Sequence, residues 1–310
     1  MSDNNKEEII FWATPEFALP SLKYLDKLGV LKAVVTQPDR PAGRGKNILA
    51  APVKKYAREN KIAILEPDKL DEAFILELKK YLPATFLVVA YGRIIPQHIL
   101  VLSELPALNI HPSRLPELRG PSPIQTAILR GFTTTGVSLM QLDQKMDHGP
   151  ILGQIQVKIE PNESYLELAE RLSQLGAGLL ASYLNDYLSD RLSPLPQSDK
   201  EATYCKLINK ADGQIDWSKS APDIHNQVRA FNPWPSTYTK LGDLDIKIIK
   251  TEVVNDKLEP AQIKADRDLI VGTGEQALKI LELQPAGKKI MTAAEFIRGY
   301  NKYLPGKMAT

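Results

Sequence analysis

Short apolar runs recur along the first half of the chain, and each is followed by a segment with helical spacing of its apolar residues. The runs EIIFWAT (8–14), LKAVVTQ (31–37) and ATFLVVAY (84–91) each hold at least four consecutive or nearly consecutive apolar side chains. Strands of this kind belong to a parallel sheet that helices cover on both faces. The alternation therefore predicts an α/β architecture with a mostly parallel sheet.

The pattern changes near residue 190. Residues 190–203 combine two prolines with mixed polar residues, which is typical of a linker. Beyond them, short alternating stretches such as DIKIIKTEVV (245–254) follow one another at the spacing of a small antiparallel barrel. We therefore expect a Rossmann-like α/β domain over residues 1–189, a linker over 190–203, and a smaller, OB-like β-barrel domain over 204–310.

Composition is that of an ordinary globular protein and excludes several classes. Of the 310 residues, 43% are hydrophobic and 25% are charged. No apolar run approaches the ~20 residues of a membrane span. The acidic start MSDNNKEEIIFW lacks a signal core, so we expect a cytoplasmic protein. Cys205 is the single cysteine, which excludes a disulfide framework and a multi-cysteine metal cage.

Two basic clusters lie in a chain whose net charge is only +2. Six basic residues lie between Asp39 and Arg58 with Asp39 as the single acid, and five lie after Gln284 with Glu295 as the single acid. Such clusters can neutralise phosphates, and they can equally form a solvated surface. The charge pattern alone leaves both interpretations open.

A group of polar side chains follows the apolar run ALNI (107–110). Asn109 and His111 are two residues apart, so on a strand they point to the same side, at the sheet edge where α/β folds bind ligands. An amide can stabilise a developing oxyanion, and a neutral imidazole can accept a proton. Asp143 and Asp147 offer a carboxylate to orient that imidazole, and Asp147 is preferred because it lies beside a glycine turn. A turn-capping Asn109 with a core-packed His111 would explain the same spacing.

A resemblance to the folate-dependent formyltransferases begins at LNIHPSRLPELRGPSPIQ (108–125) and continues at GVSLMQLDQKMDHG (136–149). Further motifs occur in the family's order: FWATPEFA (11–18), TQPDRPAGRGK (36–46) and RAFNPWP (229–235). They narrow the resemblance to the methionyl-tRNA formyltransferase family.

The resemblance implies a reaction and a role for each residue of the site. The family moves a formyl group from 10-formyltetrahydrofolate to the amino group of methionyl initiator tRNA, giving formylmethionyl-tRNA for translation initiation. Asn109 matches the amide that holds the formyl oxygen, His111 the imidazole that manages the amine proton, and Asp147 the carboxylate that orients it. No metal and no covalent enzyme intermediate are implied.

The same resemblance implies a set of folate-contacting residues: Ser113, Arg114, Leu115, Pro116, Val89, Tyr91, Gly92 and Asp143. This sequence departs from the family pattern at five positions. Arg114 replaces a leucine and is expected to point to solvent, Trp12 and Ala13 replace the family's usual small residues, and Lys145 and His148 replace a glycine and a threonine.

The resemblance also covers residues that would bind the acceptor, methionyl-tRNA. Phe17 corresponds to an aromatic residue near the methionine side chain. The loop RPAGRGKN (40–47) corresponds to the insertion that reaches the tRNA acceptor end, so Arg40, Arg44 and Lys46 are predicted tRNA contacts. The C-terminal barrel predicts a surface for the tRNA backbone. A monomer is the default expectation.

Other functions remain compatible with this scaffold. A folate-dependent N-formyltransferase acting on a nucleotide-linked amino sugar would share Asn109, His111 and Asp147, and a formate-releasing hydrolase would use water in place of the amine. A non-catalytic RNA-binding protein would not need these three residues together. No Gly-x-Gly-x-x-Gly motif follows the first strand, which argues against a nicotinamide-dependent dehydrogenase.

Overall fold

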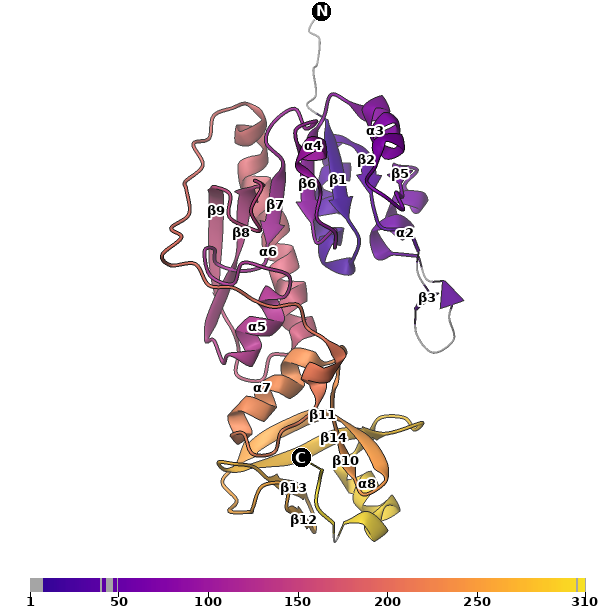
Figure 1. Cartoon of the computed structure of the whole chain (residues 1–310), viewed down its shortest axis with the longest axis vertical. Coiled ribbons are helices and arrows are strands. Elements are labelled where there is room, and N and C mark those ends of the chain that lie inside the picture. The colour runs from indigo at the N-terminus through magenta and orange to yellow at the C-terminus, as the bar shows by residue number, and fades with distance from the viewer. Residues whose placement is uncertain (1–7, 40, 43–46, 49, 305, 310) are drawn as a thin grey trace, which may run out of the picture. The chain divides into compact units, whose positions relative to one another are not determined.

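The computed structural model describes residues 8–39, 41–42, 47–48, 50–304 and 306–309. Its larger sheet has seven strands (Figure 1), in the order β5 (Ala63–Leu65), β2 (Leu31–Val35), β1 (Ile9–Ala13), β6 (Thr85–Val89), β7 (Leu108–His111), β8 (Thr134–Gln141) and β9 (Ile151–Lys158). The first five strands are parallel to one another, and β8 runs antiparallel to β7. This arrangement confirms the predicted fold class.

Continuous burial explains why the central strands β1 and β6 are almost entirely apolar. Every residue of β1 and of β6 is buried, because helices pack on both faces of the sheet. The helices that follow the early strands are α1 (Leu19–Leu28), α2 (Pro52–Glu59), α3 (Glu72–Leu78) and α4 (Gln97–Leu100). Short 3-10 turns lie at Glu16–Ala18 and Lys79–Tyr81.

A close helix–sheet contact fixes the orientation of β7. The long helix α6 (Tyr165–Leu188) passes the sheet at Gly176, where an added Cβ would lie 2.8 Å from Ile110 Cγ2. Ile110 therefore faces the helix. Because side chains alternate along a strand, Asn109 and His111 project from the opposite face of β7.

The second sheet is antiparallel, in the order β10 (Thr237–Leu241), β11 (Leu244–Val254), β14 (Ala277–Pro285), β13 (Leu269–Gly272) and β12 (Ile263–Ala265), with β15 (Met291–Thr292) paired to β14. Helices α7 (Ala221–Phe231) and α8 (Ala293–Gly299) contribute Ile224 and Phe296 to its core, where Trp217 is fully buried. The remaining elements are α5 (Pro123–Leu129), the paired strands β3 (Pro41–Ala42) and β4 (Asn47–Ile48), and 3-10 turns at Lys210–Gly213 and Asn301–Tyr303.

The chain forms two compact units that interleave along the sequence. One comprises residues 1–120, 136–157 and 169–204, and the other comprises 121–135, 158–168 and 205–310. The predicted limits at residues 189 and 204 stay a prediction. Among the described helices, none has the length and apolar character needed to cross a membrane.

Candidate active site

Strand β7 carries two of the predicted site residues at its carboxyl end. Asn109 is 8% exposed and His111 is 4% exposed. Within the described part of the chain, the side-chain amide of Asn109 has no hydrogen-bond partner, and its polar atoms are not fully enclosed. The amide is therefore available to a ligand, and the alternative in which it caps a turn receives no support.

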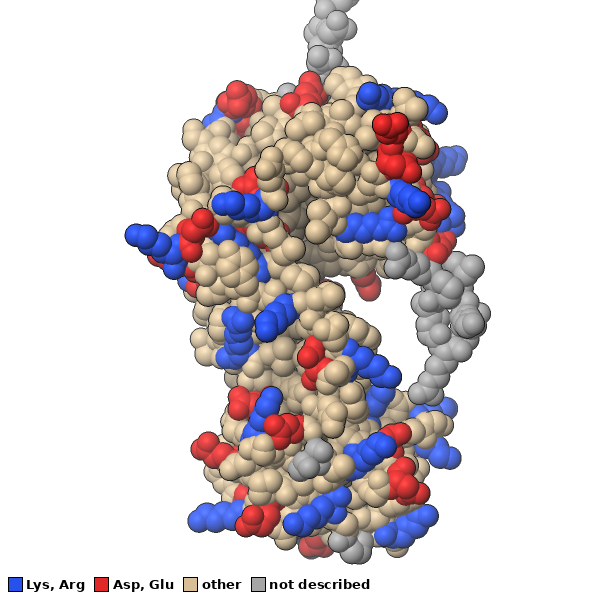
Figure 2. All heavy atoms as spheres, viewed as in Figure 1, with Lys and Arg blue, Asp and Glu red and all other residues tan. Residues whose placement is uncertain are grey.

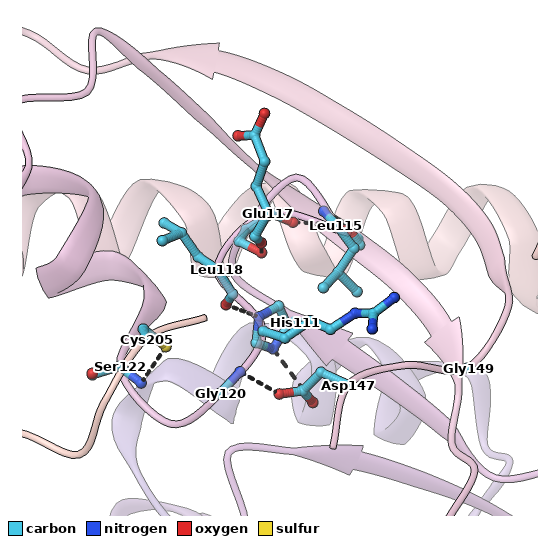
Figure 3. Close-up of polar contacts among 12 residues, drawn as sticks. His111, Leu115, Glu117, Leu118, Gly120, Ser122, Asp147, Gly149 and Cys205 are labelled. Atoms are coloured by element: carbon cyan, nitrogen blue, oxygen red, sulfur yellow. Dashed lines mark hydrogen bonds and ion pairs between the residues drawn. The ribbon is translucent and has the colours of Figure 1, made fainter. Parts of the chain in front are cut away.

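The hydrogen bonds of His111 indicate which ring nitrogen is free to take a proton. Its Nε2 lies 3.0 Å from the carbonyl oxygen of Leu118, which can only accept, so Nε2 carries the hydrogen and donates (Figure 3). The other nitrogen, Nδ1, lies 3.7 Å from Oδ1 of Asp147. A proton taken up at Nδ1 would face a carboxylate, which stabilises the imidazolium.

Asp147 reaches His111 from the loop between β8 and β9, as the sequence analysis expects. Its backbone has a φ of 50°, in the left-handed region that non-glycine residues seldom adopt. The backbone N–H of Gly120 donates to its Oδ2 at 2.8 Å, which leaves Oδ1 directed at the imidazole. Asn109, His111 and Asp147 thus gather at one edge of the sheet.

The predicted folate-contacting run after β7 is held by internal hydrogen bonds. Ser138 Oγ donates to the Ser113 carbonyl at 2.7 Å and accepts from the Leu115 N–H at 3.1 Å. Gln154 donates to the Leu115 carbonyl at 2.7 Å, and the Pro116 carbonyl accepts from the Thr203 N–H at 3.2 Å. These polar groups therefore fix the shape of the turn, and contacts of the run with a folate remain a prediction.

Arg114 stays on the surface, as expected. Its guanidinium donates to Gln156 Oε1 and to Glu117 Oε1, both at 2.9 Å, and its side chain is 45% exposed. Surface partners therefore satisfy the guanidinium of the arginine that replaces the family's leucine.

The segment after β6 presents backbone beyond the carboxyl edge of the sheet. Val89 and Tyr91 are buried, whereas Ala90 and Gly92 are exposed and have φ values of 49° and 84°. Thr14 Oγ1 and Gln37 Nε2 donate to the Tyr91 carbonyl at 3.0 and 2.8 Å. A side chain at position 92 would be strained by this positive φ, and its Cβ would lie 2.5 Å from Gln37 Nε2, so Gln37 would have to shift.

Trp12 belongs to the core. It is fully buried, and its ring contacts Phe74, Phe86 and Tyr91 at centroid distances of 5.7, 5.4 and 5.3 Å. The aromatic packing therefore accommodates the tryptophan that replaces the family's small residue. Phe17, the predicted methionine contact, is partly buried in the short turn before α1.

Polar contacts of His148 further tie the loop that carries Asp147. His148 Nδ1 lies 2.6 Å from Asp143 Oδ2, and its Nε2 lies 3.5 Å from Asp199 Oδ1. A hydrogen bond from Arg119 lowers the pKa of Asp199. Asp143 also accepts from the Lys145 N–H at 2.9 Å, so its carboxylate is engaged within the loop.

The predicted tRNA-contacting residues Arg40, Arg44 and Lys46 lie outside the described residues. Directly before them, Asp39 accepts a hydrogen bond of 2.6 Å from Lys54, which also pairs with Glu66. Lys54 is 4% exposed, so this ion pair is a buried anchor at the start of the segment.

Among the described residues, no cluster of three His, Cys, Asp or Glu side chains has a geometry suited to a metal ion. The arrangement suits acyl transfer, with an amide for a developing oxyanion, an imidazole for a proton and a carboxylate behind it. Three partners of the site are not among the predicted residues: Gly120, Ser138 and Gln197, whose amide donates to the Asp147 and Gly149 carbonyls. Their contacts join segments far apart in the sequence, and no local pattern signals them.

Comparison with known proteins identifies the family. Residues 18–184 match the model of the formyl transferase family, and residues 207–301 match that of the formyl transferase C-terminal domain. A methionyl-tRNA formyltransferase of Thermodesulfovibrio yellowstonii is 46% identical over 94% of this chain and 95% of its own length. One of Myxococcus xanthus is 40% identical over 97% of both chains.

Solved structures agree on the fold. An N-formyltransferase from Helicobacter canadensis, in complex with folinic acid and dTDP-3-aminofucose, superimposes with a TM-score of 0.68 at 21% identity, over 88% of this chain and 98% of its own. A sugar 3N-formyl transferase has a TM-score of 0.69 at 21% identity, over 92% and 100% of the two chains. Likeness at this identity concerns architecture, whereas the full-length relatives decide the family. The chain belongs to the methionyl-tRNA formyltransferase family, as its sequence motifs predict.

Proposed function

We propose that this chain transfers the formyl group of 10-formyltetrahydrofolate to the amino group of methionyl initiator tRNA, and that Asn109, His111 and Asp147 carry out the transfer. The observation that supports this most is the position of His111. One ring nitrogen is committed to the Leu118 carbonyl, and the other faces Asp147. Among the residues that the structure describes, the side-chain amide of its strand neighbour Asn109 has no hydrogen-bond partner.

Each residue has a distinct part in this proposal. The amine of the methionyl group attacks the formyl carbon, and the Asn109 amide donates to the oxygen on which negative charge develops. His111 Nδ1 takes the amine proton, and Asp147 stabilises the resulting imidazolium. His111 then returns the proton to N10 of the folate as the bond between N10 and the formyl carbon breaks. The acceptor gains the formyl group, and tetrahydrofolate leaves with the proton.

The tRNA would contact two regions. The segment of residues 40–47 is one, by its resemblance to the family's insertion. The antiparallel-sheet region is the other, and Figure 2 shows its visible face with Lys and Arg side chains interspersed among acidic ones. Such a surface suits several separate phosphate contacts better than one continuous basic groove. A monomer acting in the cytoplasm, where translation starts, completes the proposal.

The choice of acceptor is tested directly by offering each candidate acceptor in a separate reaction. Purified protein and 10-formyltetrahydrofolate would be incubated with methionyl initiator tRNA, with a nucleotide-linked amino sugar, or with no acceptor. Formylmethionyl-tRNA as the only product supports the proposal. A formylated sugar would assign the chain to the other acceptor class, and free formate in all three reactions would indicate a hydrolase.

A further inference from the structure

Gln197 links the segment predicted as a linker to the loop that carries Asp147. Its side-chain Nε2 donates to the carbonyl of Asp147 at 3.0 Å and to the carbonyl of Gly149 at 2.7 Å. One amide group thus binds two carbonyls that lie two residues apart, on either side of His148. The segment itself is fixed to the sheet, because Leu195 pairs with Ile151 of β9 through two hydrogen bonds of 2.8 Å.

Arg119 determines which way the Gln197 amide points. Its Nε donates to Gln197 Oε1 at 3.0 Å, and its side chain is 2% exposed. A guanidinium only donates, so the amide oxygen must face Arg119 and the NH₂ group must face the loop. Arg119 is held in turn by Asp199 at 2.8 Å. The adjacent residue, Gly120, supplies the N–H that binds the Asp147 carboxylate.

Asp147 is therefore held at both ends. Gln197 holds its backbone carbonyl, and Gly120 holds its carboxylate. Such support is needed because the φ of 50° at Asp147 is unfavourable for a residue with a side chain. The gap of 3.7 Å between Asp147 Oδ1 and His111 Nδ1 is also sensitive to small shifts of the loop. We call the two hydrogen bonds from Gln197 to the Asp147 and Gly149 carbonyls the clamp. Without the clamp, the loop between β8 and β9 could relax, and the Asp147 carboxylate would move relative to the His111 imidazole.

We propose that Gln197, oriented by Arg119, is a positioning residue that acts on formyl transfer through Asp147. The proposal rests on the catalytic role proposed for Asp147. It assigns a part in the reaction to residues 195–199, a stretch whose sequence predicts only a linker. Removal of the Gln197 amide should lower turnover and leave the affinity for both substrates unchanged. A misplacement of about 1 Å at a reacting group can lower a rate on the order of 100-fold, so a loss of roughly 10- to 100-fold is expected.

The test is a double-mutant cycle on the full-length protein. Gln197→Ala removes the clamp, and Gln197→Glu keeps the side-chain length and the pairing with Arg119 but presents no donor to the two carbonyls. Each is made alone and with Asp147→Asn, and single-turnover formyl transfer, KM for both substrates and thermal unfolding are measured. If Gln197 acts through Asp147, either substitution lowers kcat in the parent and has little further effect in the Asp147→Asn background.

Gln227 provides a matched control, because its Nε2 also binds two carbonyls, those of Asp212 and Gln214, at 2.7 and 3.0 Å. Gln227→Ala should leave kcat unchanged. Equal losses of kcat in the parent and in the Asp147→Asn background would show an independent effect and overturn the proposal, as would full activity of Gln197→Glu. If Asp147→Asn alone keeps full activity, the catalytic role of Asp147 fails instead. Should Gln197→Ala not fold, the Gln197→Glu cycle decides the question.

Discussion

Gly149, two residues after Asp147, provides a sharp test of how closely the loop must fit. A Cβ built on Gly149 would lie 2.1 Å from the carbonyl oxygen of Gln141 and 3.0 Å from its carbonyl carbon. Gln141 ends β8, where its N–H donates to the Pro150 carbonyl at 2.9 Å. The strand is held by its neighbours, so in Gly149→Ala the loop must move.

The displacement follows from the contact distance. Ordinary van der Waals contacts begin at 3.4 Å, so the added Cβ and the Gln141 oxygen must separate by about 1.3 Å. A shift of this size at Asp147 should lower kcat on the order of 100-fold, equivalent to about 2.7 kcal/mol of transition-state stabilisation. Forcing a methyl group into a packed site should also destabilise the fold by about 1–3 kcal/mol.

The assay is single-turnover formylation of methionyl-tRNA, run below the unfolding temperature of every variant. Gly178→Ala is the control, because Gly178 lies on the exposed side of α6 and a Cβ there meets nothing within 4 Å. This variant should keep full activity and gain up to about 1 kcal/mol of stability. Normal turnover by folded Gly149→Ala would refute the claim that the reaction depends on the loop's position.

Three other perturbations have defined outcomes. His111→Ala should lower turnover by at least about 100-fold while the protein stays folded, as circular dichroism would verify, and retained activity would remove His111 from the mechanism. Lys54→Met should lower the free energy of unfolding by about 3 kcal/mol, because it leaves the Asp39 and Glu66 carboxylates unpaired; an unchanged melting temperature would contradict this. Burial lowers the pKa of Lys54, but hydrogen bonds with Asp39 and Glu66 raise it overall, and Lys54 lowers the pKa of Asp39. The contribution of the Asp39–Lys54 pair to stability should therefore be lost as the pH falls below 3.8 or rises above 10.5. Unfolding curves across pH would detect this loss in the parent and not in Lys54→Met. Arg44→Ala should raise the KM for tRNA and leave that for the folate unchanged, and equal KM values for tRNA would argue against its assigned contact.

Much of the fold follows from local pattern. The mainly apolar runs at residues 8–14, 31–37 and 84–91 form β1, β2 and β6, because the residues of a strand that is buried on both faces are nearly all apolar. The spacing of Asn109 and His111 also places them correctly on one side of β7.

The hydrogen bonds that hold the site residues in place could not be predicted in the same way. Gln197 meets Asp147 across 50 positions of sequence, and Arg119 meets Gln197 across 78. A polar segment with two prolines is typical of a linker, and nothing in it signals that one amide will bind two carbonyls of a distant loop. Trp12 illustrates the same limit. As a substitution in a family motif it suggests an altered pocket, whereas its ring packs among Phe74, Phe86 and Tyr91.

The most direct test of the proposed mechanism is the single-turnover rate of formyl transfer from 10-formyltetrahydrofolate to methionyl initiator tRNA in Asn109→Ala, with folate affinity measured on the same sample. The account predicts a loss on the order of 10²–10³ in rate, because one oxyanion donor is removed, with little change in affinity for the folate. An unchanged rate, or a loss explained wholly by weaker folate binding, would contradict the role given to Asn109 and with it the proposed transfer step.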